Sequence, residues 1–183
     1  MDFDLIRSGR KTLAAEIRNG RLVIRAPRMA SSDEITRFIM SNRQWIESHL
    51  EKARAMEKEK ESVRRLTPEE IRELADRALE TIPRRVAFYA EKIGVRYGRI
   101  TIRAQKTRWG SCSSKGNLNF NCLLMLAPMD VLDGVVVHEL CHLKVMNHSP
   151  RFYREVEKVL PDYRERQKWL RENGGKILAM IGA

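Results

Sequence analysis

The segment from residue 128 to residue 146 constrains the fold of this chain most, because apolar residues occupy almost every side of the helix that it predicts. Valines fill positions 135–137 before its polar residues, and Leu143 and Val145 follow them. A helix that is apolar all round is buried in a core. We therefore expect this helix at the centre of a folded domain, with its polar side chains enclosed.

Those polar residues form the pattern H-E-x-x-H, at His138, Glu139 and His142. Two histidines four positions apart lie on one face of a helix, where both imidazoles can hold one tetrahedral zinc ion. Glu139 points about 100° around the helix from His138, so it can reach a metal-bound water rather than the metal. Burying such a group of side chains is costly unless a metal or hydrogen bonds satisfy it.

A third histidine follows closely in the sequence. The chain has four histidines, and His138, His142 and His148 fall within eleven residues, whereas His49 lies far from them. His148 comes six residues after His142, beyond the helix, where the chain can turn back toward it. The alternative is a set of hydrogen-bonded core histidines without a metal. The clustering favours one zinc ion per chain with three protein ligands and an open fourth position, as in catalytic sites.

The expected chemistry is hydrolysis. Zinc lowers the pKa of a bound water to about 7, and a neighbouring carboxylate can take its proton and pass it to the leaving group. Glu139 is the candidate for this general base. The pattern fits attack at a carbonyl or at a phosphoryl centre and leaves both open.

The surrounding residues resemble a known family. Residues 108–112 (R-W-G-S-C), the segment 117–121, the pattern at 138–142 and residues 147–149 (N-H-S) together resemble the YgjP-like metallopeptidase family, which is related to the SprT-like and WLM zinc peptidases. The resemblance covers most of the chain. It implies an α+β, zincin-like domain with a small antiparallel sheet and an active-site helix. It also implies a polypeptide substrate, with His138, His142 and His148 as zinc ligands and Glu139 as general base.

Two segments are candidates for binding substrate. Arg108 and Trp109 could bind a phosphate or a carboxylate near the zinc; alternatively, Trp109 anchors the loop in the core and Arg108 caps a carbonyl. Asn117, Asn119 and Asn121 alternate with apolar residues, so a strand there would bury one face and align three amides on the other. The resemblance suggests that this strand borders the cleft and pairs with an extended substrate through its backbone.

The sequence predicts that the chain folds as two regions. In residues 1–65 we expect a β-hairpin, whose strands at 11–17 and 22–26 flank a turn at Asn19 and Gly20, and a helix that begins with a capping box at Ser31. Its apolar face extends to Leu50 and includes Trp45, and residues 51–65 form a helical extension or linker. In residues 66–183 we expect the catalytic domain. Its first helix begins with a capping box at Thr67 and ends at Gly94, strands follow at 99–103 and 117–124, and Gly174 and Gly175 end the last helix.

The charge of the chain leaves two further functions open. The formal net charge is +11, and residues 84–115 contain nine basic residues and one acidic residue. Such a surface attracts nucleic acids, nucleotides or acidic proteins, although it could also be an ordinary solvated face. Beside the zinc peptidase we therefore consider a metal-dependent nucleoside triphosphate hydrolase and a nucleic-acid-associated peptidase.

The sequence also gives an expectation for location. Its first residues lack the pattern of a signal peptide, and no apolar run approaches the ~20 residues of a membrane-spanning helix. Three cysteines form an odd number without a paired framework. Together these features predict a cytoplasmic protein without a membrane partner.

Overall fold

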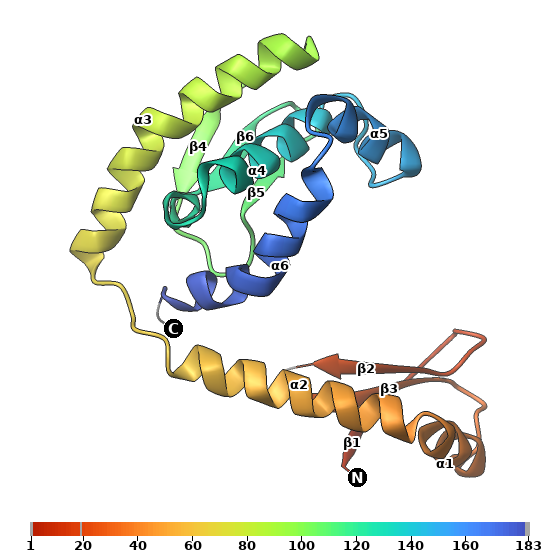
Figure 1. The fold of residues 1–183 in the computed structure, drawn as a ribbon. Helices are drawn as coiled ribbons and strands as arrows, with labels where there is room; N and C mark the ends of the chain where they lie inside the picture. Colours follow the sequence, from red (N-terminus) through yellow and green to blue (C-terminus); the bar gives the residue numbers. More distant parts are fainter. Residues whose placement is uncertain (1, 19, 182–183) are drawn as a thin grey trace. The chain divides into compact units, whose positions relative to one another are not determined.

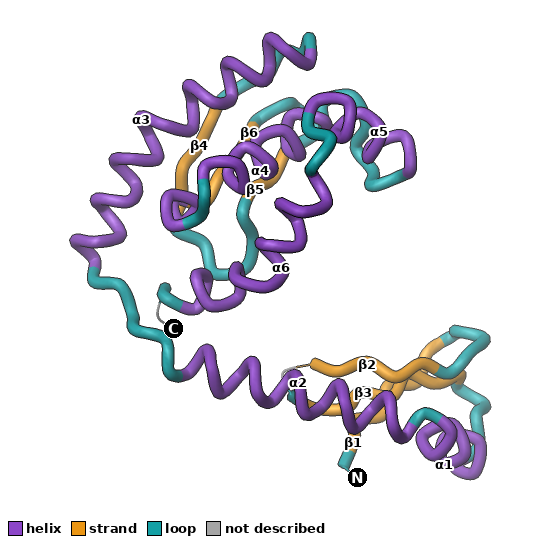
Figure 2. Tube along the Cα trace, viewed as in Figure 1, coloured by secondary structure: helices purple, strands orange, loops and turns teal. Residues whose placement is uncertain are grey.

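The computed structural model describes residues 2–18 and 20–181, except for the side chains of residues 56, 57 and 59–61. The α+β class that the sequence predicts is confirmed, with helices and two small sheets (Figures 1 and 2). The chain divides into two compact units, one ending at Ser62 and the other beginning at Val63, slightly before the boundary expected after residue 65. The Leu66 amide donates to the carbonyl of Met180, so the residues just after the division pack with the second unit.

The first unit contains a three-stranded sheet in the order β1-β3-β2. Strands β2 (Ala14–Arg18) and β3 (Arg21–Pro27) form the expected antiparallel hairpin, of which Asn19 lies outside the described residues. Strand β1 (Phe3–Ser8) was not expected and pairs with β3 in parallel. Its partner β3 comes after β2 in the sequence, so no local pattern within β1 reveals the pairing.

Two helices follow where the sequence suggested one. Helix α1 (Ser32–Ser41) begins with the predicted capping box at Ser31, and α2 (Arg43–Glu61) carries the helical extension. They separate at Asn42, whose side chain and backbone amide both donate to the carbonyl of Phe38. Trp45, which the sequence placed on the apolar face of a single helix, is 44% exposed on α2. The unit's core is formed by Leu22, Ile24, Ala26, Ile35, Ile46 and Leu50.

The second unit begins with the long helix α3 (Pro68–Ile93). The predicted capping box at Thr67 and the end at Gly94, in the left-handed conformation with φ of 74°, are both confirmed. One apolar face of α3 is buried, including Ile82 and Val86. This face packs against α4 and the segment η1 (Cys122–Leu126), so α3 forms one wall of the unit's core (Figure 1).

The second sheet has the order β4-β6-β5, formed by β4 (Ile100–Arg103), β5 (Gly110–Cys112) and β6 (Leu118–Asn121). We expected an antiparallel sheet; instead β4 and β6 are parallel and only β5 and β6 are antiparallel, so the sheet is mixed. The reason is β5, which was expected as part of a loop. It forms a hairpin with β6 and leaves β6 in the middle. Strand β6 also ends early, because the Asn121 side chain accepts from the Leu123 amide and starts the helical turn η1.

Helix α4 (Met129–Cys141) occupies the centre of this unit, as the sequence predicts, and is buried along most of its length. It contacts α3, α5 (Pro150–Val159), α6 (Tyr163–Ala179) and β5. It ends earlier than expected, with His142 as its C-cap, and Met146 lies exposed beyond it. Among the described residues, every helix falls short of the length or the apolarity that crossing a membrane requires.

Helix α6 does not end at its two glycines, so that expectation was wrong. A Cβ atom built on Gly174 would lie 3.1 Å from the indole ring of Trp109. Gly174 is therefore a packing position, at which the absent side chain lets the Trp109 ring lie against α6.

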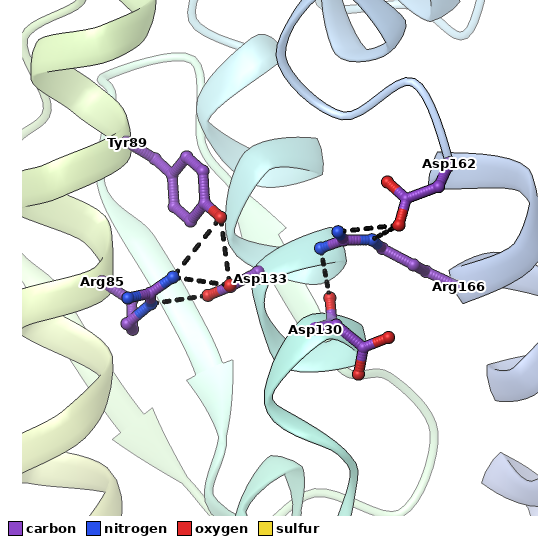
Figure 3. A network of polar contacts seen from close by, with 6 residues as sticks. All are labelled: Arg85, Tyr89, Asp130, Asp133, Asp162 and Arg166. Carbon is purple, nitrogen blue, oxygen red and sulfur yellow. Dashed lines mark hydrogen bonds and ion pairs between the residues drawn. The ribbon is translucent and has the colours of Figure 1, made fainter.

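Polar contacts hold α4 from two sides (Figure 3). On the side of α3, Arg85 donates two hydrogen bonds of 2.6 Å to the Asp133 carboxylate, to which the Tyr89 hydroxyl also donates. On the side of α6, Arg166 donates to the Asp162 carboxylate and to the carbonyl of Asp130. Because Asp133 is buried, its charge depends on these partners. The network fixes the first turns of α4 and so positions its last turn.

Candidate active site

The three clustered histidines meet at the end of α4. His138 lies in its last turn, His142 is its C-cap, and His148 comes from the segment before α5. Nε2 of His138 lies 3.2 Å from Nε2 of His142 and 3.0 Å from Nε2 of His148. Tetrahedral zinc with bonds of about 2.0–2.1 Å places its ligand atoms roughly 3.3 Å apart. The two distances from His138 are close to this spacing, and the ligand atoms of the three residues lie within 4.8 Å of one another, so these residues could hold a metal ion.

The second nitrogen of two of these rings has a protein partner. Nδ1 of His138 lies 2.5 Å from the Tyr163 hydroxyl oxygen, to which the Gln167 amide also donates. Nδ1 of His142 lies 3.2 Å from the carbonyl oxygen of Val145. Such partners fix the orientation and the tautomer of a ligating histidine. In both residues they leave Nε2, the nitrogen atom that faces the other rings, for a metal.

The surroundings of His138 and His142 favour their neutral imidazoles. Burial, together with the neighbouring His142 and His148, lowers the pKa of His138 to about 3. Burial also lowers the pKa of His142. The fully buried ring of Phe152 contacts all three histidine rings, at centroid distances between 4.5 and 5.0 Å. Neutral imidazole is the form that binds metals, so this apolar floor favours ligation.

Glu139 is buried beside the histidines and faces the start of β5. Burial raises the pKa of Glu139 to about 7, and the positive charge of Arg108 acts in the opposite direction. A Cβ atom on Gly110 would lie 2.8 Å from both Cγ and Oε1 of Glu139. No real side chain tolerates that distance, so glycine at position 110 makes room for the carboxylate.

The family described as YgjP-like, metallopeptidase domain, matches residues 11–77 and 57–173. The chain belongs to the YgjP-like metallopeptidase family. Among curated proteins, none matches.

Two solved structures are similar to this YgjP-like chain. The metallopeptidase zymogen of Pyrococcus abyssi abylysin is 23% identical, with a TM-score of 0.46 over 50% of this chain and 94% of that one. The metallopeptidase zymogen of Methanocaldococcus jannaschii jannalysin is 20% identical, with a TM-score of 0.45 over the same shares of the two chains.

The two candidate residues before β5 differ in their surroundings in this YgjP-like domain. Arg108 is exposed, and its charge acts on the neighbouring Glu139. Trp109 is half-buried and packs against the main core and against Gly174. Trp109 therefore anchors the loop, as one of the two interpretations expected, and it also lines a cavity next to Glu139.

The three asparagines do not form one row of exposed amides. The buried Asn121 side chain donates to the carbonyls of Gln105 and Arg108, and Asn117 accepts from the Arg99 amide, so both hold loops. Asn119 Oδ1 is buried without a hydrogen-bond partner in the described part of the chain. Strand β6 is paired with β4 and with β5, so its backbone is not available to a substrate strand. The expected pairing at β6 is therefore corrected.

Sequence reasoning missed three residues of the YgjP-like site: Gly110, Tyr163 and Gln167. Tyr163 and Gln167 lie four positions apart, on one face of α6. The signal for them was indirect, because a ligating histidine usually has a partner for its second nitrogen. Nothing in the sequence shows which of many polar residues supplies it. Gly110 belongs to the R-W-G-S-C segment, but nothing in the sequence explains why a glycine is needed there.

Proposed function

We propose that this YgjP-like metallopeptidase is a zinc-dependent peptidase in which His138, His142 and His148 bind one zinc ion through Nε2. The observation that supports it most is the spacing of these nitrogen atoms, 3.0 and 3.2 Å from the central one. The lowered pKa values and the fixed Nδ1 partners of His138 and His142 agree with ligation. Three ligands leave a position open, as in catalytic zinc sites.

In this proposal Glu139 is the general base. When bound, zinc acts as a Lewis acid and lowers the pKa of water toward neutral pH. Glu139 accepts a proton from the attacking water and returns it to the leaving amine. Its buried place beside the three histidines suits a carboxylate that takes a proton and passes it on. Gly110 keeps the space that this side chain needs.

The proposed substrate is an extended polypeptide that pairs with β5. This strand is at an edge of its sheet, with β6 as its partner on the other side. Gly110 at its start lies against Glu139, so a peptide added to this edge would lie close to the general base. Main-chain hydrogen bonds then provide affinity that depends little on sequence.

One observation keeps a nucleoside triphosphate hydrolase as the second candidate, namely the exposed Arg108 close to Glu139. An arginine there could bind a phosphate. Eight of the nine basic residues between 84 and 115 are exposed, while Arg85 is bonded to Asp133. Parallel assays on unfolded protein and on nucleoside triphosphates, with Arg108→Ala, decide between the two. An association with nucleic acid and a cytoplasmic location stay predictions.

We expect about one zinc ion per chain, and a loss of zinc in His148→Ala. His148 is exposed in the segment after α4, so its removal deletes a ligand without opening the core. Zinc affinity should fall by more than the 10–100-fold that loss of an outer partner causes. Metal analysis after dialysis against a competing chelator measures it. His49→Ala, which changes the exposed histidine on α2, is the matched control and should keep its zinc. Full retention in His148→Ala would exclude His148 as a ligand.

Tyr163→Phe should weaken zinc binding by about 10–100-fold and leave the fold unchanged. The hydroxyl holds Nδ1 of His138, and phenylalanine keeps the ring but loses this contact. Chelator competition measures the affinity, and circular dichroism checks the fold. Tyr153→Phe removes a hydroxyl from another tyrosine near the site and should change the affinity little. Equal affinities in the two variants would contradict a positioning role for Tyr163.

A further inference from the structure

A cavity of about 190 Å³ lies directly beside Glu139 and His138. One wall comes from α4, with Val131, Gly134 and Val135, and the opposite wall comes from α6. Trp109 and Gly110 close it at the start of β5. The proposed general base and one of the three histidines therefore line it.

The polar groups of the α6 wall are already engaged. All three guanidinium nitrogens of Arg166 donate to Asp162 or to the carbonyl of Asp130, as Figure 3 shows. The Tyr163 hydroxyl is bonded to His138 and Gln167. Cβ and Cδ of Arg166 lie 3.3 Å from where a Cβ atom of Gly134 would be, so the stem of the arginine lies against α4. What remains for a ligand is mainly the apolar surface of two valines, Leu170 and Trp109.

The size of the cavity limits what it can bind. Sites for drug-sized molecules have about 300–1,000 Å³, which is more than this cavity offers. An apolar cavity of roughly 150 Å³ can bind benzene. The cavity therefore suits one aliphatic or phenyl side chain and excludes acidic ones, because Glu139 would repel them and the Arg166 guanidinium is already paired.

We propose that this cavity is a specificity pocket for the side chain of a substrate residue that adjoins the scissile bond. The preferred residues are leucine, isoleucine, methionine and phenylalanine. The inference rests on the proposed peptidase function, since it assigns a substrate side chain to that same site. Backbone pairing at β5 would bind the peptide, and this pocket would select the bond at which it is cut.

The first experiment maps the sites at which the zinc-loaded full chain cleaves unfolded, reduced and carboxymethylated proteins, using mass spectrometry. We expect the four apolar residues to be enriched at one position next to the cleaved bond. Leu170→Ala enlarges the pocket and should raise the ratio of kcat/KM for tryptophan over leucine by about tenfold or more. Leu170→Trp fills it and should shift the preference toward alanine by a similar factor. Leu178→Ala, the same deletion on α6 outside the cavity, should leave the preference unchanged.

Each outcome decides one of the two proposals. Cleavage without an apolar preference, or a preference that both Leu170 variants retain, overturns the pocket and leaves the peptidase standing. If no peptide is cleaved, the peptidase proposal fails, and binding decides the pocket. N-acetyl-leucinamide should then shift the indole N–H resonance of Trp109, identified with Trp109→Phe, whereas N-acetyl-glutamate amide should not. No shift with the leucine probe overturns the pocket as well.

Discussion

Peptide hydrolysis should fall by at least ~100-fold in Glu139→Gln, while the metal content stays at the level of the unchanged chain. Glutamine has nearly the same shape as glutamate, so it fits above Gly110, but its amide cannot accept the proton of the attacking water. The histidines and their partners are not altered by the change. Turnover and metal content, measured on the same sample, separate loss of the base from loss of the metal.

Glu155→Gln is the matched control, because it makes the same substitution on α5, where Glu155 pairs with Lys144 and Lys158. We expect nearly unchanged hydrolysis in that variant. Near-normal turnover in Glu139→Gln would show that another group activates the water. Loss of metal in Glu139→Gln would instead mean that the glutamate supports the metal site.

The second large effect concerns stability. Arg85→Ala should lower the free energy of unfolding by about 3 kcal/mol, toward the lower end of the 3–5 kcal/mol measured for broken buried pairs. The buried Asp133 carboxylate would lose two hydrogen bonds of 2.6 Å and its compensating charge, keeping only the Tyr89 hydroxyl. The lower end applies because the Arg85 side chain is 32% exposed. Urea denaturation followed by circular dichroism measures the change.

Arg84→Ala serves as the control, since Arg84 is the exposed neighbour on the same helix. A surface change of this kind stays within about 0.5 kcal/mol. Restoring stability by adding Asp133→Leu to Arg85→Ala would show that the unpaired carboxylate causes the loss. Equal effects of Arg84→Ala and Arg85→Ala would contradict the structural role of the pair.

Local signals in the sequence predicted local features well. Both capping boxes, at Ser31 and Thr67, form as the spacing indicates, because their hydrogen bonds join residues three positions apart. The left-handed end at Gly94 follows from glycine's freedom at positive φ. The central place of α4 follows from its apolar composition, which only a core accommodates. His148 was placed near its partners by the short distance along the chain.

Features that depend on distant partners were missed or misplaced. Strand β5 has only three residues, and two of them, Gly110 and Ser111, do not favour strands. It forms because β6 pairs with it, and this pairing also moved the free edge of the sheet from β6 to β5. The contact between Tyr163 and His138 joins two helices, so no pattern within either helix predicts it. The loop-holding roles of Asn117 and Asn121 likewise need the folded chain.

The contact between Gly110 and Glu139 couples two distant positions of the chain. A Cβ atom at 110 would meet both Cγ and Oε1 of Glu139, and an aspartate at 139 keeps its Cγ, so the shorter acid relieves only part of the contact. The effects of Gly110→Ala and Glu139→Asp should therefore not add, as is usual for residues in contact. Substitutions tolerated at one position should therefore depend on what occupies the other. A variant library that randomises either position alone would discard combinations that work together.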